Sequence, residues 1–344
     1  MIRPHRLSRS EHTVNRRHHR VRRFGLSGII GLASLLSLIT ALAPLRQAAA
    51  FNVNGQAAAQ AVGQLNADGS TNYTSSTPNN PVNVGLNSPG GTAVDGTRHL
   101  LYVADTNNNR VLVHVLNSDN SLPDYKADYV IGQSTFATTR ANRGNGTPAA
   151  NSLKLPDRVA VESSTGNVYV SDTGNNRVLI FATVSSNDPN ASNVIGAGNF
   201  TTTNSGGTVS SSQMLSPEGV AFSGSGGGLK IYVADKDFNR VLIFNQITGN
   251  GQAAVNVLGQ TSFVASGSAL SQSGMASPTG VYYNSGSLLV ADSSNNRVLI
   301  WNVTISSDGQ NANLVLGQTW FYSNGSGVSA TAMNRPTEDR KSVV

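Results

Sequence analysis

Residues 101–114 read LYVADTNNNRVLVH, and this stretch decides the fold because the chain repeats it. Close copies occur as VYVSDTGNNRVLIF at 168–181, IYVADKDFNRVLIF at 231–244 and LLVADSSNNRVLIW at 288–301. The arginines of successive copies lie 67, 63 and 57 residues apart. A repeat of this length indicates one supersecondary unit that stacks on copies of itself, because a single unit cannot bury its own apolar faces.

Two shorter signatures flank each copy. Upstream, a Leu or Met stands three residues before a Pro, as Leu86 stands before Pro89. Downstream, a Val-Ile-Gly or Val-Leu-Gly run is followed by a Phe, as residues 130–132 are followed by Phe136. Short β-branched and aromatic runs, separated by Asn, Asp, Gly and Ser, predict four antiparallel strands per unit. In the first unit we expect these strands near 91–95, 101–104, 110–114 and 129–133.

The repeated unit predicts an all-β fold. A four-stranded meander has two faces to cover, and roughly four to eight such sheets stacked around an axis form a β-propeller. We therefore expect a β-propeller of four-stranded antiparallel blades. The four complete blades fall at about 85–136, 152–200, 213–263 and 274–321.

Both ends of the repeat region carry partial copies. Residues 51–53 match the end of a third strand and 61–64 match a fourth strand, which predicts an N-terminal strand that closes the last blade. Residues 333–337 match the opening of a fifth blade. We interpret 339–344 as an artefact, because a common sequencing adapter would encode these residues. The propeller region 51–338 is therefore expected to be incomplete, from a gene model truncated at its C-terminal end.

The positive charge of the chain is concentrated in its leader. The chain has 24 Lys and Arg against 18 Asp and Glu, but residues 1–50 hold nine arginines and one acid. The rest is mildly acidic, with 15 bases and 17 acids. Arginines, then an apolar run, then Ala48-Ala49-Ala50 predict a signal peptide over 1–50. We therefore expect an exported protein, secreted, periplasmic or at the cell surface, with an uncleaved membrane anchor and a twin-arginine signal as open alternatives.

The composition excludes several classes of protein. The chain has no cysteine, which excludes a disulfide framework, a Cys-ligated zinc site and a thiol nucleophile. A cysteine-free exported chain is typical of bacteria rather than of animal extracellular domains. Nucleic-acid binding needs a basic face, and the chain after the leader has too few bases for one. We therefore expect no nucleic-acid partner.

The repeated motifs resemble NHL repeats. The resemblance lies in the Pro-x-Gly-Val opening at 217–220 and 278–281, the Tyr-Val-Ala-Asp strand and the Asp-x-x-Asn-Asn-Arg-Val turn. It covers about 51–337, and it departs from the pattern at Arg158, where other units have Gly, and at Phe238, where they have Asn. It implies a ring that is usually six-bladed, with five blades as the alternative. It also implies a binding platform, since only a minority of the family are enzymes.

An Asp and an Arg bracket the turn of every copy. The Asp ends the second strand, where its carboxylate can accept hydrogen bonds from turn amides, and the Arg that opens the third strand can pair with it. Repetition in all units favours a structural role, because a catalytic site needs asymmetry. Calcium is the alternative, although the turn lacks the length and the closing Glu of a twelve-residue calcium loop. The structural turn residues are Asp105, Asn109, Arg110, Asp172, Asn176, Arg177, Asp235, Asn239, Arg240, Asp292, Asn296 and Arg297.

Histidine and glutamate form no catalytic pattern. Four of the six histidines lie in the leader, and His99 falls in a turn. His114 takes the place that Phe181 has in the second unit, so we expect a packed ring. Glu162 and Glu218 are separate in the sequence. We therefore identify no catalytic, cofactor-binding or metal-binding residue and expect no cofactor. The alternative is a propeller hydrolase or lyase with a metal in the central channel, as in enzymatic relatives of NHL propellers.

The loops between blades are the predicted binding surface. In a meander they share one face with the turns between second and third strands. They are rich in Ser, Thr, Asn and Gly, which suits hydrogen bonding to a ligand. We therefore expect a binding or scaffold module for a protein, peptide or glycan, with membrane contact only through an uncleaved leader. The loops span 137–152, 201–213, 264–274 and 322–332.

Overall fold

The computed structural model describes residues 61–66, 70–72, 74, 81–302 and 304–337. The signal peptide over 1–50, the match at 51–53 and the suspected artefact at 339–344 lie outside these residues, so all three stay predictions. Across the described ranges, no helix has the length and apolar character needed to cross a membrane.

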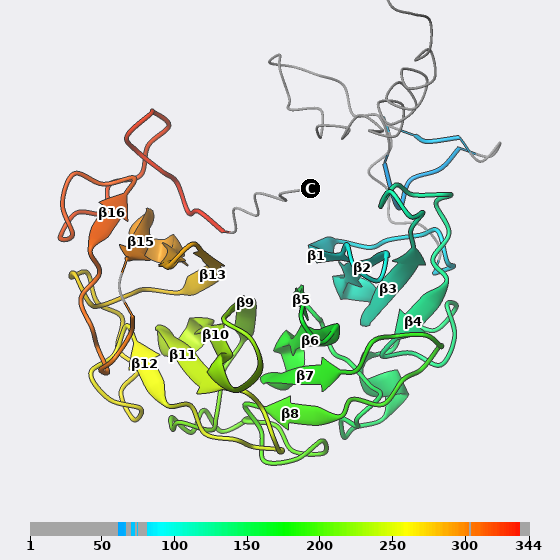
Figure 1. Ribbon diagram of the computed structural model, residues 1–344, viewed down its shortest axis with the longest axis horizontal. Coiled ribbons are helices and arrows are strands. Elements are labelled where there is room, and N and C mark those ends of the chain that lie inside the picture. Colours follow the sequence, from blue (N-terminus) through cyan, green and yellow to red (C-terminus); the bar gives the residue numbers. More distant parts are fainter. Residues whose placement is uncertain (1–60, 67–69, 73, 75–80, 303, 338–344) are drawn as a thin grey trace, which may run out of the picture. The chain divides into compact units, whose positions relative to one another are not determined.

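Four antiparallel sheets of four strands each follow one another along the chain, and we call them blades 1 to 4 (Figure 1). Every strand pairs with its neighbours in chain order, which confirms the all-β fold of four-stranded antiparallel blades. Blade 1 holds β1 (Pro89–Asp95), β2 (Leu100–Asp105), β3 (Arg110–Val115) and β4 (Tyr129–Ile131). Blade 2 holds β5 (Arg158–Glu162), β6 (Asn167–Asp172), β7 (Arg177–Phe181) and β8 (Asn193–Ile195). Blade 3 holds β9 (Pro217–Ser223), β10 (Lys230–Asp235), β11 (Arg240–Asn245) and β12 (Asn256–Leu258), and blade 4 holds β13 (Pro278–Asn284), β14 (Ser287–Asp292), β15 (Arg297–Trp301) and β16 (Leu314–Leu316).

A short 3-10 turn connects the second and third strands of every blade. In blade 2 this turn is η3 (Thr173–Asn175), and Asn176 ends it with a left-handed backbone at φ 57°. Asn tolerates this conformation better than most residues, which explains why an Asn precedes the Arg in all four copies. The equivalent turns are η1 (Thr106–Asn108), η5 (Lys236–Phe238) and η6 (Ser293–Asn295), and two further 3-10 turns lie elsewhere, η2 (Ala141–Gly144) and η4 (Gly226–Gly228).

The first strands bring neighbouring blades together. Strand β5 contacts β1 and β9, and β9 contacts β13. Figure 1 shows these first strands on the inner side of the succession, with the fourth strands on the outer side. At Gly219 the approach is so close that an added Cβ would lie 2.8 Å from the Val281 nitrogen and 2.9 Å from the Thr279 carbonyl oxygen. Glycine is therefore required there by the backbone of the next blade.

Apolar clusters fill the spaces between blades. Val168 and Leu179 pack toward Tyr102 in blade 1, whereas their sequence neighbours Tyr169 and Ile180 pack in the cluster shared with blade 3. Successive residues of a strand point to opposite faces, so each central sheet is buried on both sides. The third cluster joins blades 3 and 4 around Trp301.

The Leu or Met of the upstream signature packs against the glycine that follows the fourth strand of the previous blade. Leu153 is fully buried and lies against Gly132, which has φ 88° and follows the fourth strand of blade 1. Met214 and Met275 occupy the same place in the next two interfaces. The signature therefore marks the residue that closes each interface between blades.

The two partial copies differ in how far they follow the repeat. Met333 lies against Gly317 as Leu153 lies against Gly132, so residues 333–337 dock on blade 4 like the opening of another blade. Residues 61–64, expected to form a fourth strand, are outside any strand, although Gly63 packs against Leu86 in the usual way. A fourth strand needs a third strand beside it, and the described residues place none there. The number of blades and the closure of the ring stay predictions.

Candidate ligand-binding face

The Asp and Arg of each turn form a fully buried ion pair. Arginine Nε lies 2.6–2.8 Å from aspartate Oδ2 in all four blades, and both side chains have no exposed area. The antiparallel register explains this, since the two residues are directly opposed where the second and third strands meet, as Asp172 opposes Arg177. The pairs are Asp105–Arg110, Asp172–Arg177, Asp235–Arg240 and Asp292–Arg297.

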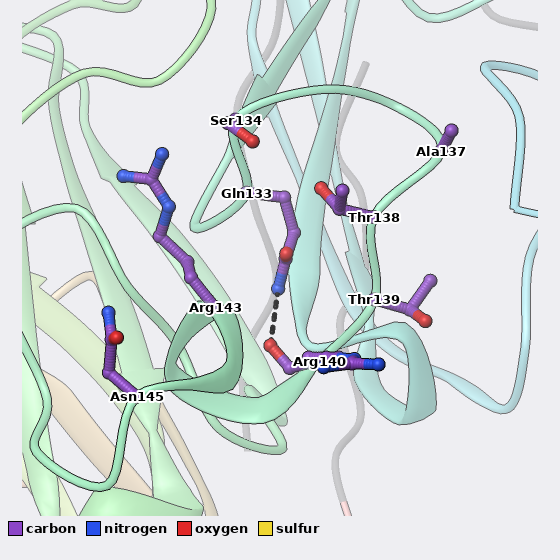
Figure 2. Close-up of a pocket in the computed structure, with 8 residues that line it drawn as sticks. All are labelled: Gln133, Ser134, Ala137, Thr138, Thr139, Arg140, Arg143 and Asn145. Atoms are coloured by element: carbon purple, nitrogen blue, oxygen red, sulfur yellow. Dashed lines mark hydrogen bonds between the residues drawn. The ribbon is translucent and has the colours of Figure 1, made fainter.

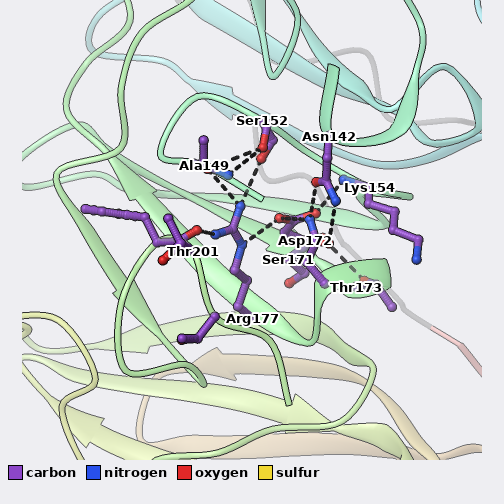
Figure 3. Close-up of polar contacts among 12 residues, drawn as sticks. Asn142, Ala149, Ser152, Lys154, Ser171, Asp172, Thr173, Arg177 and Thr201 are labelled. Atoms are coloured by element: carbon purple, nitrogen blue, oxygen red, sulfur yellow. Dashed lines mark hydrogen bonds and ion pairs between the residues drawn. The ribbon is translucent and has the colours of Figure 1, made fainter. Parts of the chain in front are cut away.

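Each arginine also donates both to the loop before its blade and to the loop after it, and Figure 3 shows the arginine of blade 2, Arg177. The second terminal nitrogen of Arg177 donates to the carbonyls of Ala149 and Ser152, at 2.9 and 3.0 Å. The first donates to the carbonyl of Phe200, which follows the fourth strand of the same blade. The guanidinium therefore donates to three carbonyls and one carboxylate. Only Arg can do this, because its planar group carries five N–H donors in a fixed arrangement.

The aspartates accept from one distant backbone amide and from side chains in or beside the turn, rather than from the backbone amides of the turn that we expected. Asp172 Oδ1 accepts from the backbone N–H of Lys154 at 2.7 Å, and its Oδ2 accepts from Asn175 at 2.8 Å as well as from Arg177. Of the backbone amides in this turn, the Asn176 N–H donates to the Thr173 carbonyl and the Gly174 N–H donates to the Lys154 carbonyl, so neither is bonded to the aspartate. Both carboxylate oxygens are thus engaged by donors, a set that does not fit a calcium ion.

Burial dominates the electrostatics of three of these aspartates. It raises the pKa of the Asp172 and Asp292 carboxyls and brings that of Asp235 to about 7, while the paired guanidinium and the hydrogen bonds oppose the rise. A buried carboxylate is tolerated only because its charge is matched and its lone pairs are filled.

The last Asn of each turn links its blade to the next one. Asn176 Oδ1 accepts from the backbone N–H of Ser216 at 2.9 Å, and its Nδ2 donates to the carbonyl of Asn204 at 3.3 Å. The repeat in the sequence identifies these Asn residues but not their partners. The partners of Asn176 lie 28 and 40 residues further on. The same acceptor bond joins Asn109 to Leu155, Asn239 to Ser277 and Asn296 to Arg335.

These bonds define one face of the molecule, which we call the turn face. It consists of the turns between second and third strands together with the loops that join successive blades. Every turn network binds carbonyls or amides of those loops, and we propose that the repeated Asp, Asn and Arg residues hold the loops in place.

The two departures from the repeat have local compensation. Phe238 replaces the Asn that donates to the turn aspartate, and its buried ring lies 5.1 Å from the guanidinium carbon of Arg240. Arg158 replaces the Gly at the start of the first strand, and its guanidinium pairs with Asp157 at 3.0 Å.

The loop 137–152 carries the most unusual backbone on the turn face. Asn142, Arg143 and Gly144 have φ values of 50°, 60° and 84°, a run of three left-handed residues inside η2. A left-handed non-glycine residue costs about 1–2 kcal/mol, so contacts must hold this turn. The buried Asn142 amide exchanges two hydrogen bonds with Asn175 of the blade 2 turn, at 2.8 and 3.1 Å. Arg143 pairs with Asp188 at 3.0 Å.

A pocket of about 460 Å³ opens beside this turn (Figure 2). Gln133 lines the pocket and connects the loop to the turn of blade 1. Its Nε2 donates to the carbonyls of Asn109 and Arg140, at 2.9 and 3.0 Å. Arg140 is exposed, and its guanidinium has no ion partner among the described residues. The lining contains two basic side chains and no carboxylate. Its residues are Gln133, Ser134, Ala137, Thr138, Thr139, Arg140, Arg143 and Asn145.

Glu218, which seemed isolated in the sequence, lies in a small charged group at the start of β9. Its Oε1 accepts from Lys236 Nζ at 2.7 Å, and Asp157 and Arg158 of blade 2 act on it electrostatically. Burial raises the pKa of this carboxyl. Glu162 instead accepts from Ser164 and Asn167 within its own turn. No group of three His, Cys, Asp or Glu side chains suited to a metal ion occurs among the residues that the structure describes.

His114 is a buried ring, as expected from the Phe at this position in blade 2. Only 1% of it is exposed, and its Nδ1 lies 3.1 Å from the Lys126 carbonyl oxygen. Its Nε2 has no hydrogen-bond partner among the described residues. Burial lowers the pKa of His114, while the carbonyl and the charges of Asp128 and Asp124 oppose this. The ring is therefore neutral in the folded state at neutral pH.

Replacing His114 with Phe is expected to reduce the acid sensitivity of the fold. The native ring takes up a proton less readily than the unfolded one, whose pKa is about 6.5, so stability falls as the pH drops below that value. His114→Phe removes this loss and should stabilise the protein at pH 5 by about 1 kcal/mol more than at pH 7.5. Urea unfolding of both proteins at the two pH values measures the difference. Equal pH dependence in the two proteins would exclude this role for His114.

Comparisons with known proteins identify the repeat. Segments 86–113, 153–181 and 275–301 match the model of the NHL repeat, and they fall on blades 1, 2 and 4. A search of curated proteins gave no significant match.

Several solved structures align with parts of this chain. A streptogramin B lyase aligns at 11% identity with a TM-score of 0.36, covering 66% of this chain and 53% of its own. Auxiliary nutrient binding proteins from Bacteroides thetaiotaomicron and Bacteroides ovatus align at 12% and 11% identity with TM-scores of 0.40 and 0.41. They cover 59% and 61% of this chain, and 45% and 47% of their own. The chain thus spans about half the length of these structures.

The three segments that match the NHL repeat model agree with the strands of the four sheets. Each matched segment contains the first three strands of a blade or most of them, including the buried Asp–Arg turn. The chain therefore carries NHL repeats in these three segments, and its described units are four-stranded antiparallel sheets of the kind that forms β-propeller blades.

Proposed function

We propose that this chain is an exported binding or scaffold module whose peptide or glycan ligand contacts the turn face. The observation that carries the proposal is the pocket of about 460 Å³ beside the left-handed turn of the loop 137–152. Strained backbone that is held by specific contacts is commonly a feature of ligand sites. Export is supported by the order of charged, apolar and small residues in 1–50.

The chemistry of the pocket favours a polar ligand with a carboxylate or another anionic group. Thr138, Thr139 and Asn145 supply hydroxyl and amide groups, and Arg140 supplies a guanidinium that is free of an ion partner among the described residues. A guanidinium binds a carboxylate through two parallel hydrogen bonds. Acidic glycans and peptides with Asp, Glu or a terminal carboxylate share this group, and the experiment separates them.

Replacing Arg140 with Ala is expected to weaken ligand binding by about tenfold or more, because a hydrogen bond to a charged group contributes about 1.5–3 kcal/mol. The mature protein is screened against arrays of acidic glycans and acidic peptides, and the affinity for the hits is measured by calorimetry. Because Arg140 is exposed, thermal stability should not change.

Lys126→Ala is the matched control. It removes one basic charge from a loop between third and fourth strands, which the meander places on the opposite face, and it should leave binding unchanged. Ligands that Arg140→Ala retains and Lys126→Ala loses would contradict the assignment to the turn face. A stoichiometric, tightly held metal in the purified protein would instead favour a propeller hydrolase or lyase.

A further inference from the structure

Blade 4 carries two exposed aromatic side chains that the other blades lack. Trp320 is 72% exposed and Tyr322 is 71% exposed. Both belong to the tight turn after the fourth strand, where the Ser323 N–H donates to the Trp320 carbonyl at 3.2 Å. Blades 1 and 3 have the same turn, in which Thr138 bonds to Thr135 and Ala265 to Ser262. The two aromatic residues are therefore additions to a shared backbone.

The turn that carries the two rings is fixed to the frame of blade 4. Phe321, which stands between them, packs inward against the third cluster, and its carbonyl accepts from Arg297. Gln318 Nε2 donates to the carbonyl of Asn296 at 2.9 Å and to that of Gly325 at 2.8 Å. Both rings are thus presented on the turn face by a segment that hydrogen bonds hold at several points.

The exposure of the rings does not depend on blade 4 being the last blade described. Blades 1, 2 and 3 each have a successor, and there the residues equivalent to Tyr322 are exposed or partly exposed all the same. These residues are Ala137, Thr201 and Val264, the last with 75% of its area exposed. The position of Trp320 corresponds to Thr135 and Asn199, which are exposed, and to Ser262, which is partly exposed. By contrast, Leu316 corresponds to Ile131 and Ile195, which are fully buried. The exposure of Leu316 is therefore not shared by the equivalent residues of blades 1 and 2.

The segment that carries the pair has no charged side chain of its own. From residue 309 to residue 334 the sequence has no Asp, Glu, Lys, Arg or His, and it is rich in Ser, Asn, Gly and Thr. Two exposed rings in an uncharged field of hydroxyl and amide groups match a ligand that is itself neutral, with apolar C–H faces and hydroxyl edges. A peptide anchor side chain is better served by an enclosed, desolvated pocket, and the pocket described above lies in blade 1.

We infer that Trp320 and Tyr322 form a stacking platform for a neutral glycan, with hexose or pentose rings lying against the aromatic faces. This site is separate from the pocket beside Arg140, and it stands whether or not that pocket binds an anionic ligand. Amphipathic aromatic rings are well suited to such a surface, because they bury a large apolar area with little loss of conformational entropy.

Tryptophan fluorescence provides a direct test, because the chain has two tryptophans and Trp301 is fully buried. Acrylamide quenching of the mature protein therefore reports mainly on Trp320. The protein is titrated with neutral oligosaccharides of glucose, mannose, galactose and xylose. We expect at least one of them to shield Trp320 from acrylamide. Protection by none of these sugars, or only by charged polysaccharides or neutral peptides, would overturn the inference.

Calorimetry on variants then assigns the binding to the two rings. Trp320→Ala with Tyr322→Ala should weaken binding of the shielding oligosaccharide by about tenfold or more, as expected for contact residues that dominate a site. Trp320→Phe keeps a flat ring and should retain part of the affinity. Val264→Thr, at the equivalent exposed position of blade 3, is the control and should bind normally. Unchanged affinity in the double variant would refute the platform.

Discussion

Replacing Asp172 with Asn is expected to lower the free energy of unfolding by about 3 kcal/mol or more, because it leaves the guanidinium of Arg177 buried without its counter-charge. The substitution preserves shape, but the aspartate uses both oxygens as acceptors. An asparagine offers one acceptor and turns the other position into a donor, which then faces either the Lys154 N–H or the Arg177 guanidinium. Urea unfolding at neutral pH measures the loss.

Asp188→Asn is the matched control for that experiment. It removes the charge from the Arg143–Asp188 pair, whose side chains are 25% and 28% exposed. Exposed pairs contribute about 0–1 kcal/mol, and Asn tolerates the left-handed backbone of this position at φ 58°. Equal losses in the two variants would show that the buried Asp172–Arg177 pair contributes no more to the free energy of unfolding than the partly exposed pair does.

Shortening Leu153 to Ala is expected to cost about 2–5 kcal/mol, since the residue has no exposed area and closes the space between blades 1 and 2. The cavity left behind is bounded by Gly132, which has no side chain that can move into it. The loss should appear as a lower midpoint in chemical denaturation.

Leu155→Ala provides the comparison two residues away. This leucine is 42% exposed, and its backbone N–H, which donates to Asn109, is unaffected by the change. The cost should stay within about 0.5 kcal/mol. A similar loss at both positions would refute the role of Leu153 in the interface.

The strands could be located from the sequence because their pattern is local. The second strand, expected near 101–104, is Leu100–Asp105, and the third, expected near 110–114, is Arg110–Val115. The fourth strand, expected near 129–133, is shorter and ends at Ile131, because Gly132 adopts φ 88° and leaves the extended conformation. Repetition made these assignments secure, since four copies show the same alternation.

The partners of the turn residues could not be predicted, because they depend on how blades stack. Nothing in the sequence connects Asp172 with the backbone of Lys154, or Asn176 with that of Ser216. The acceptors are side-chain oxygens of residues that recur in every copy. The donors are backbone amides, which nearly every residue has, so the sequence does not indicate which of them is used. The structural role of the twelve turn residues is accordingly our proposal, and the Asp172 variant tests it.

The candidate ligand contacts lie where the copies differ. Trp320 and Tyr322 stand at positions that hold Thr135 and Ala137 in blade 1, so an alignment of the four units would have exposed them. The pocket beside Arg140 gave no such signal, because the loops between blades differ in length and the left-handed turn depends on long-range contacts of Asn142.

The Asn links also bear on how such a chain grows. Each unit brings the side chain that receives its successor and the backbone amide that its predecessor requires, as Asn176 and Leu155 show for blade 2. A duplicated unit inserted between two others therefore arrives with both halves of the junction already in place. For this bond, a duplicated unit needs no compensating substitution on either side, while the exposed residues of the new copy are free to diverge.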